Sequence, residues 1–171
     1  WDDDKIAWYE NTDGKGNFGP QQIVSTNARN AQSVFAADID GDGDVDLASA
    51  SVNDLKIAWY ENTRGSIEAF GGEQIVSTSG VVYCRFVVAA DIDGDGDIDL
   101  ASASDQGGTL WYENTDGKGN FGPQQIVSTD ATGARAVFAA DIDADGDIDL
   151  ASASWDDDKI AWYENTDGKG N

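Results

Sequence analysis

The stretch Asp38-Ile-Asp-Gly-Asp-Gly-Asp-Val-Asp46 places aspartates at every other position of a nine-residue loop. Nearly the same loop recurs over residues 91–99 and 141–149. Carboxylates this close together repel one another unless a cation neutralises them. Oxygen ligands at alternating positions suit Ca²⁺, which accepts roughly six to eight of them. The sequence therefore predicts about three Ca²⁺ ions per chain, one in each loop.

The three loops share one division of roles. Positions 1, 3, 5 and 9 are expected to supply side-chain oxygens, and position 7 a backbone carbonyl with its side chain directed away from the ion. Glycine at position 6 supplies the backbone dihedrals of a sharp turn. Position 4 is Ala144 in the third copy, where the others have glycine. Because position 4 offers no ligand, we expect this site to bind still, but more weakly. The predicted metal-site residues are Asp38, Asp40, Asp42, Asp44, Asp46, Asp91, Asp93, Asp95, Asp97, Asp99, Asp141, Asp143, Asp145, Asp147 and Asp149.

Other metals and other calcium motifs fit these loops poorly. The chain has no histidine and one cysteine, so zinc and copper lack their usual ligands. An EF-hand has a glutamate at position 12 and flanking helices. Position 12 is Ser49, Ser102 and Ser152 here, and short apolar or alternating runs flank each loop. We therefore expect each loop to close a β-hairpin.

A repeat of blade size surrounds each loop. The marker Trp-Tyr-Glu-Asn begins at Trp8, Trp59, Trp111 and Trp162, at spacings of 51, 52 and 51 residues. One period holds four expected strands, over residues 33–38, 46–51, 56–62 and 73–78. Four strands in roughly 40–50 residues predict an all-β protein, a β-propeller of four-stranded antiparallel blades. The expected division is a partial blade of two strands (1–32), two blades (33–83 and 84–135) and a partial blade of three strands (136–171).

These residues resemble the FG-GAP/VCBS repeats, which also build the propeller of integrin α-subunits. The resemblance rests on the three acidic loops and on Phe18-Gly-Pro20, Phe70-Gly-Gly72 and Phe121-Gly-Pro123. It implies calcium held in the hairpin between the first two strands of a blade, away from the ligand-binding face. In that family the ion shapes the scaffold and is usually not the ligand site.

Charge narrows the choice of partners. The chain has 33 acidic residues against 10 Lys and Arg, for a formal net charge of −23. Such a surface repels nucleic acid and anionic membranes, so we expect neither as a partner. Multi-carboxylate loops fill best where Ca²⁺ is millimolar, which favours a secreted or cell-surface protein. The lack of Asn-x-Ser/Thr sequons is compatible with the bacterial source that we expect.

Residues 1–17 and 155–171 have the same sequence. Propellers typically have about four to eight blades, so three repeats do not close a ring. We expect two chains to pair as a homodimer that closes a six-bladed ring, each supplying a strand to the broken blade of the other. The alternative is that these residues belong to a longer propeller chain.

Further candidate sites have simpler explanations. The Asn-Thr-Asp-Gly-Lys-Gly-Asn segments that start at residues 11, 114 and 165 are typical of turns. The Trp-Tyr pairs are expected in the core, although they could stack on sugars. Trp1 and Trp155 are better candidates for exposure, and Cys84 is expected to be a small buried residue.

No catalytic constellation stands out. The sequence lacks a nucleophile elbow and a phosphate loop. Its carboxylate pairs are the residue type that a glycosidase uses, but we assign the clustered acids to calcium binding. We therefore expect a non-catalytic extracellular binding or adhesion scaffold. The alternatives are a lectin-type propeller, an ancillary module of a secreted enzyme and a purely structural repeat without a ligand. Where a ligand exists, we expect a protein or a glycan.

Overall fold

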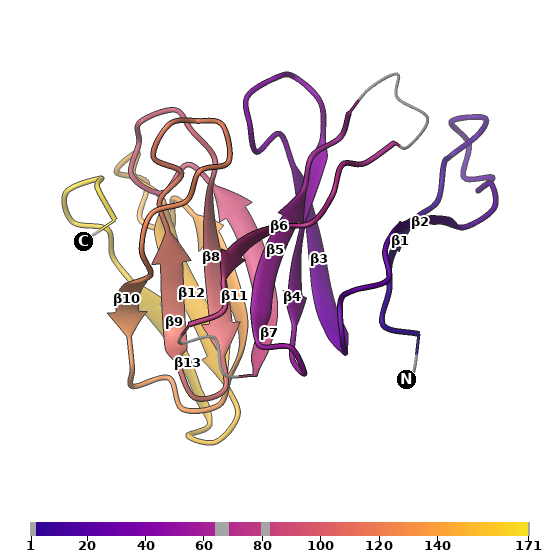
Figure 1. Ribbon diagram of the computed structural model, residues 1–171. Coiled ribbons are helices and arrows are strands. Elements are labelled where there is room, and N and C mark those ends of the chain that lie inside the picture. Colours follow the sequence, from indigo (N-terminus) through magenta and orange to yellow (C-terminus); the bar gives the residue numbers. More distant parts are fainter. Residues whose placement is uncertain (1–2, 64–68, 80–82, 171) are drawn as a thin grey trace.

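The computed structural model describes residues 3–63, 69–79 and 83–170 and is all-β over these ranges (Figure 1). The strands are short, of three to seven residues. They are β1 (Ile6–Trp8), β2 (Gln22–Ser25), β3 (Ala31–Ala37), β4 (Asp46–Ser51), β5 (Lys56–Tyr60), β6 (Gln74–Ser77), β7 (Cys84–Ala90), β8 (Asp99–Ser104), β9 (Gly108–Tyr112), β10 (Gln125–Ser128), β11 (Ala134–Ala140), β12 (Asp149–Ser154) and β13 (Lys159–Tyr163). Within the described ranges, no helix has the length and apolarity that crossing a membrane requires.

The strands form four antiparallel sheets that follow one another in chain order. They are β1–β2, β3–β4–β5–β6, β7–β8–β9–β10 and β11–β12–β13, and each strand pairs with its neighbours in the sequence. The sheet β1–β2 lies at the N-terminal end of the molecule and β11–β13 at the other end (Figure 1). The all-β prediction and the repeated four-strand pattern are confirmed.

One expected strand start was wrong by two residues. Strand β3 begins at Ala31, whereas the sequence pattern placed this start at residue 33. The pairing register shifts between Ala31 and Ser33, and again between Ala134 and Ala136. This irregularity interrupts the alternation of side chains from which a strand is recognised.

Each acidic loop joins the first strand of a sheet to the second. In the first hairpin Ala37 pairs with Asp46, so residues 38–45 form the connection and Asp46 opens β4. The second and third hairpins close in the same way, through Ala90 with Asp99 and Ala140 with Asp149. The prediction of a hairpin in place of a helix–loop–helix unit is confirmed.

The cores lie between successive sheets. All five residues of β5 are buried, and so are all five of β9, because each of these strands is covered on both faces. Trp59 packs in a cluster that also contains Cys84 and Val87 of the next sheet. The expected core position of these Trp-Tyr pairs and the burial of Cys84 are therefore confirmed for the two four-stranded sheets.

First strands lie beside one another between sheets. Strand β7 contacts both β3 and β11, while β4 contacts β7 and β8 contacts β11. One hydrogen bond between sheets runs from the backbone N–H of Val87 to Oγ of Ser33, at 3.0 Å. This arrangement brings the three acidic hairpins, which start from those first strands, to the same end of their sheets.

Candidate metal centre

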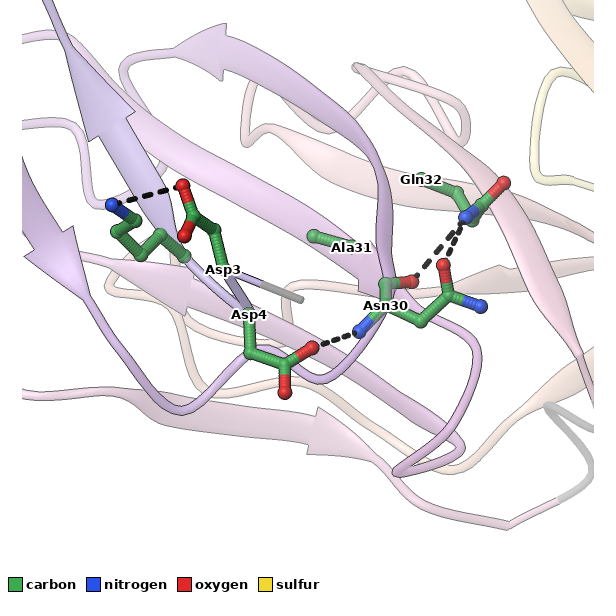
Figure 2. Close-up of a pocket in the computed structure, with 6 residues that line it drawn as sticks. Asp3, Asp4, Asn30, Ala31 and Gln32 are labelled. Carbon is green, nitrogen blue, oxygen red and sulfur yellow. Dashed lines mark hydrogen bonds and ion pairs between the residues drawn. The ribbon is translucent and has the colours of Figure 1, made fainter. Parts of the chain in front are cut away.

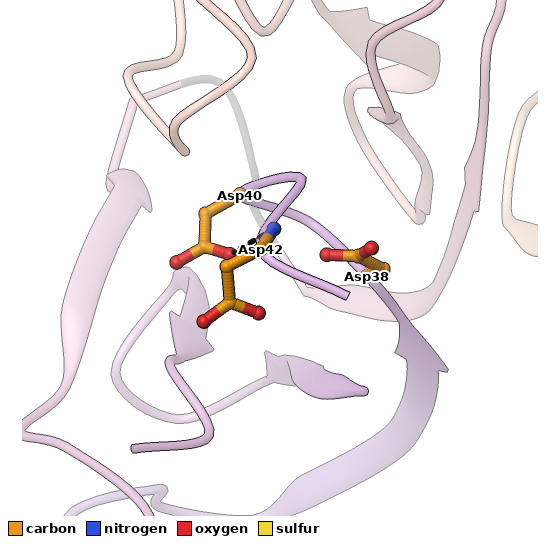
Figure 3. Close-up of side chains that lie close together, drawn as sticks. All are labelled: Asp38, Asp40 and Asp42. Carbon is orange, nitrogen blue, oxygen red and sulfur yellow. Dashed lines mark hydrogen bonds between the residues drawn. The ribbon is translucent and has the colours of Figure 1, made fainter. Parts of the chain in front are cut away.

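Three carboxylate clusters lie in the acidic loops, one per loop. Within each cluster, one oxygen from every carboxylate lies within 4.8 Å of the others. Figure 3 shows the first cluster, with its three side chains on one short turn after β3. The clusters are Asp38–Asp40–Asp42, Asp91–Asp93–Asp99 and Asp141–Asp143–Asp149. Each of these groups could hold a metal ion.

Backbone N–H groups hold the loop carboxylates in place, but some carboxylate oxygens accept no hydrogen bond. In the first loop Asp38 Oδ2 accepts the N–H of Gly43 at 3.0 Å, and Asp40 Oδ1 accepts that of Asp42 at 3.2 Å. The same two bonds recur in the other loops. Oδ1 of Asp38 and Oδ1 of Asp91 are buried and have no hydrogen-bond partner. A buried carboxylate oxygen without a donor is costly, and a cation would satisfy it.

The aspartate at position 9 fastens each loop to the rest of its sheet. Oδ2 of Asp99 accepts the N–H of Ile92 at 2.9 Å, and its Oδ1 accepts the N–H of Asn114 at 2.8 Å. Burial raises the pKa of Asp99 to about 7, against these hydrogen bonds, which act to lower it. Without a cation this carboxylate is therefore partly protonated near neutral pH.

The equivalent carboxylates differ in how deeply their sheets are covered. Burial also raises the pKa of Asp46, which accepts N–H groups from Ile39 and Asn62. Burial acts in the same direction at Asp149, but backbone hydrogen bonds from Asn165 and Ile142 outweigh it, so its pKa is lowered. The sheet of Asp149 is the one whose strand β13 remains largely exposed.

Position 3 carries the electrostatic strain within each loop. The pKa of Asp40 is raised by burial and by the charges of Asp42 and Asp38. Burial and neighbouring carboxylates likewise raise the pKa of Asp93 and of Asp143. Each of these groups therefore holds a proton more readily than a free aspartate, which is the expected state of crowded acids without a counter-ion.

Some predicted ligands lie outside the clusters. Position 9 joins the cluster in the second and third loops, whereas position 5 takes its place in the first. The remaining aspartates are Asp44, Asp46, Asp95, Asp97, Asp145 and Asp147. At position 7, Asp44 is buried, while Asp97 lies so close to the turn after β9 that a Cβ on Gly117 would be 2.4 Å from its Oδ1.

Two buried asparagines donate hydrogen bonds to these loops and were not predicted from the sequence. Asn114 follows β9 and Asn165 follows β13, and each donates hydrogen bonds to loop carbonyl groups. Both stand at the fourth position of the Trp-Tyr-Glu-Asn marker. The invariance of this asparagine in all four markers is the signal that could have identified them.

In a pocket elsewhere in the chain, the charged groups pair with other groups of the protein. It is lined by the segment 3–5 and by Asn30, Ala31 and Gln32 (Figure 2). Asp4 accepts the N–H of Asn30 at 2.9 Å, and Asp3 is paired with Lys5 at 3.1 Å. The charged groups of this pocket already have partners in the protein, in contrast with the orphaned oxygens of the acidic loops.

Comparison with known proteins agrees with the loops and the sheets. No curated protein matches the sequence. The FG-GAP-like repeat matches residues 1–49, 38–102 and 91–152, and each of these matches ends just after an acidic loop. Because the matched segments overlap and together span most of the chain, this protein belongs to the family of FG-GAP-like repeats.

Proposed function

We propose that this protein is a calcium-binding β-propeller repeat protein that acts as a non-catalytic, extracellular binding or adhesion scaffold. One Ca²⁺ in each acidic loop would stabilise the hairpin between the first and second strands of a blade. The contacts between the first strands support the proposed arrangement of the sheets as propeller blades. Strand β7 lies beside β3 and β11, as the inner strands of neighbouring blades do.

The observation that carries the calcium proposal is the pair of buried, partnerless oxygens, Oδ1 of Asp38 and Oδ1 of Asp91. Each belongs to a cluster of oxygen ligands with no nitrogen or sulfur atom, which is the donor set of a hard cation. Flexible loops with several carboxylates suit the larger Ca²⁺ better than Mg²⁺, which demands near-octahedral geometry and keeps its waters.

The test compares two Asp→Asn substitutions that remove the same charge. Asp93 and Asp116 each accept a backbone N–H through Oδ1, from Asp95 and Lys118, and asparagine can keep that bond. Only Asp93 belongs to a cluster. Calcium titration by calorimetry should find about three ions per chain in the wild type, one fewer or one much weaker in Asp93→Asn, and no change in Asp116→Asn.

Stability gives a second readout of the same proposal. Ligand that binds only the folded state adds about 2.7 kcal/mol per independent site at a hundredfold excess over Kd. Chelation should therefore lower the melting temperature strongly in the wild type and less in Asp93→Asn. A melt that excess chelator leaves unchanged would refute the calcium role.

The same features support the proposed extracellular placement and the proposed lack of catalysis. Weak multi-carboxylate sites are filled at the millimolar calcium found outside cells. The strongly acidic charge of the chain argues against nucleic acid or anionic membranes as partners. Because the titratable clusters are the loops themselves, they serve better as ion ligands than as acid–base pairs.

We also propose that a second copy of this chain covers the faces left open at the two ends and completes a six-bladed ring. Residues 56–60 and 159–163 have the same sequence, yet Ile57 is 0% exposed and Ile160 is 88% exposed. In β3, whose sheet follows the two-stranded sheet β1–β2, Val34 is 52% exposed, whereas its counterpart Val87 is 0% exposed. Ile57 and Val87 belong to one buried cluster between two successive sheets. Their exposed counterparts, Ile160 and Val34, could form the same contact between two chains.

Light scattering tests this assembly. A native mass of about two chains of 18.1 kDa is expected, and Ile160→Asp should shift it to one chain. Ile126→Asp is the matched control, because Ile126 and its counterparts Ile23 and Ile75 are all exposed on fourth strands. A wild-type monomer that stays soluble and folded would rule out the dimer and favour the longer-chain alternative.

A glycan is the second candidate for the ligand. Trp155 is 71% exposed, as its sequence position suggested, while Trp1 lies outside the described residues. The Arg135 guanidinium carbon lies 6.0 Å from the centroid of the Trp155 ring, so one face of this ring already has a partner. Binding on a glycan array at fixed calcium that is lost in Trp155→Ala would favour the lectin reading over a protein ligand.

A further inference from the structure

Asn114 joins two acidic loops that belong to different sheets. Its Nδ2 donates to the carbonyl oxygen of Ile98 at 3.2 Å, within the loop of its own sheet. The same Nδ2 donates to the carbonyl oxygen of Ile39 at 2.8 Å, in the loop of the preceding sheet. Asn165 repeats the arrangement with Ile148 at 3.2 Å and Ile92 at 2.8 Å.

These bonds end next to the clustered carboxylates. Ile39 lies between Asp38 and Asp40, which are both members of the first cluster. On the other side, Ile98 precedes Asp99 of the second cluster, and Asp99 itself accepts the backbone N–H of Asn114 at 2.8 Å. One buried residue is therefore bonded to the backbone of both loops and to a carboxylate of one of them.

The orientation of the amide is fixed by its surroundings. Oδ1 of Asn114 accepts the N–H of Gly119 at 3.1 Å, so both ends of the amide are engaged. The turn over residues 114–120 also contacts both loops, one on each side. A Cβ on Gly41 would lie 3.4 Å from the carbonyl oxygen of Gly117, while Gly117 on its other side lies against Asp97. Movement of either loop must therefore displace the turn or break its hydrogen bonds.

We propose that Asn114 and Asn165 couple cation binding between neighbouring acidic loops, so that an ion in one loop raises the affinity of the next. This coupling rests on the proposed function, namely that the loops bind calcium. An ion that draws Asp91, Asp93 and Asp99 together holds Asn114 through Asp99. Asn114 then holds the Ile39 carbonyl and with it the spacing of the first cluster. By linkage, an ion in the first loop must favour the second by the same factor.

The chain contains its own control. Asn62 occupies the same marker position after β5, and its backbone N–H donates to Asp46 at 2.7 Å. Its Nδ2 donates to the carbonyl oxygen of Val45 at 3.0 Å. Among the described residues, both of these bonds go to the loop of its own sheet, since the preceding sheet β1–β2 contains no acidic hairpin.

The experiment is a calorimetric titration of the full chain with Ca²⁺ alone. Asp143→Asn is introduced into every variant to silence the third loop, so that the first two are measured as a pair. We expect the second ion to bind about tenfold more tightly than independent sites would allow, within the usual range of coupling between sites. This excess should disappear in Asn114→Ala and persist in Asn62→Ala.

The outcomes separate the coupling from the calcium role. If the wild-type loops bind no Ca²⁺, the proposed function itself fails. If both loops bind but do so independently, or if the excess survives in Asn114→Ala, the coupling is refuted and the calcium role stands. The titration of Asp143→Asn with Asn114 unchanged tests the coupling even where Asn114→Ala does not fold, because independent binding of the two ions there refutes it.

Discussion

Gly119 offers a direct test of how the turns pack on the preceding sheet. The segments 11–17 and 114–120 have the same sequence, and their second glycines, Gly16 and Gly119, both have positive φ, at 93° and 76°. A Cβ on Gly119 would lie 2.1 Å from Cζ2 of Trp59, which is buried at 2% exposure. A Cβ on Gly16 would meet nothing within 4 Å.

The two alanine variants therefore share one cost and differ in another. Both place a side chain in the left-handed region, at a cost of about 1–2 kcal/mol. Only Gly119→Ala forces extra volume against a buried ring, which typically costs a further ~1–3 kcal/mol. The free energies of unfolding should thus differ by about 2 kcal/mol, or roughly 4–8 °C in melting temperature for a chain of this size.

The measurement is a pair of thermal and urea melts at one fixed calcium concentration. Gly170→Ala should behave like Gly119→Ala, because a Cβ there would lie 2.4 Å from Cζ2 of Trp111. Equal losses of stability in Gly16→Ala and Gly119→Ala would show that the turn does not rest on the ring. The inter-sheet packing described above would then be wrong.

Three further outcomes are expected. Lys56→Ala should cost about 3–5 kcal/mol, because Lys56 is buried and bonded to Glu73 at 2.6 Å. Lys159→Ala, in the same local sequence but exposed, should cost far less in the same urea melts. Ala144→Gly should stabilise the protein by about 0.5–1 kcal/mol in thermal melts, because Ala144 has a φ of 67°, and no gain would contradict this conformation. In metal-free protein the folded state holds the proton of Asp99 up to about pH 7, whereas the unfolded state releases it near 3.8, so stability should fall as pH rises between these values. With calcium the folded state favours the ionised carboxylates, so the free energy of unfolding should rise with pH over this range. Urea melts that give the same pH dependence with and without calcium would contradict calcium binding at this site.

Most of the local structure can be predicted from the sequence. The alternating aspartates, the glycine at position 6 and the flanking apolar runs specify a tight hairpin without reference to the rest of the chain. Burial is different, as Trp59 and Trp162 show. They stand in the same five-residue sequence, yet Trp59 is in the core and Trp162 is 48% exposed. The neighbouring sheet decides between these states, and no local pattern encodes it.

The site divides in the same way. The carboxylates that cluster are recognisable because their chemistry repeats at fixed positions. The bridging role of Asn114 is not recognisable, because its partner is a backbone carbonyl 75 residues earlier in the chain. A main-chain oxygen leaves no mark on the sequence, so the segment that contains Asn114 reads as an ordinary turn.

The direction of these bridges constrains how such an array can evolve. Asn114 and Asn165 each donate to the hairpin of the preceding sheet, so each of these two junctions is shared between two successive units. A duplication or deletion of one whole period keeps each donor opposite its acceptor. Loss of a single hairpin would instead leave one amide without its distant carbonyl. Gene rearrangements that preserve the period therefore keep these inter-loop hydrogen bonds intact.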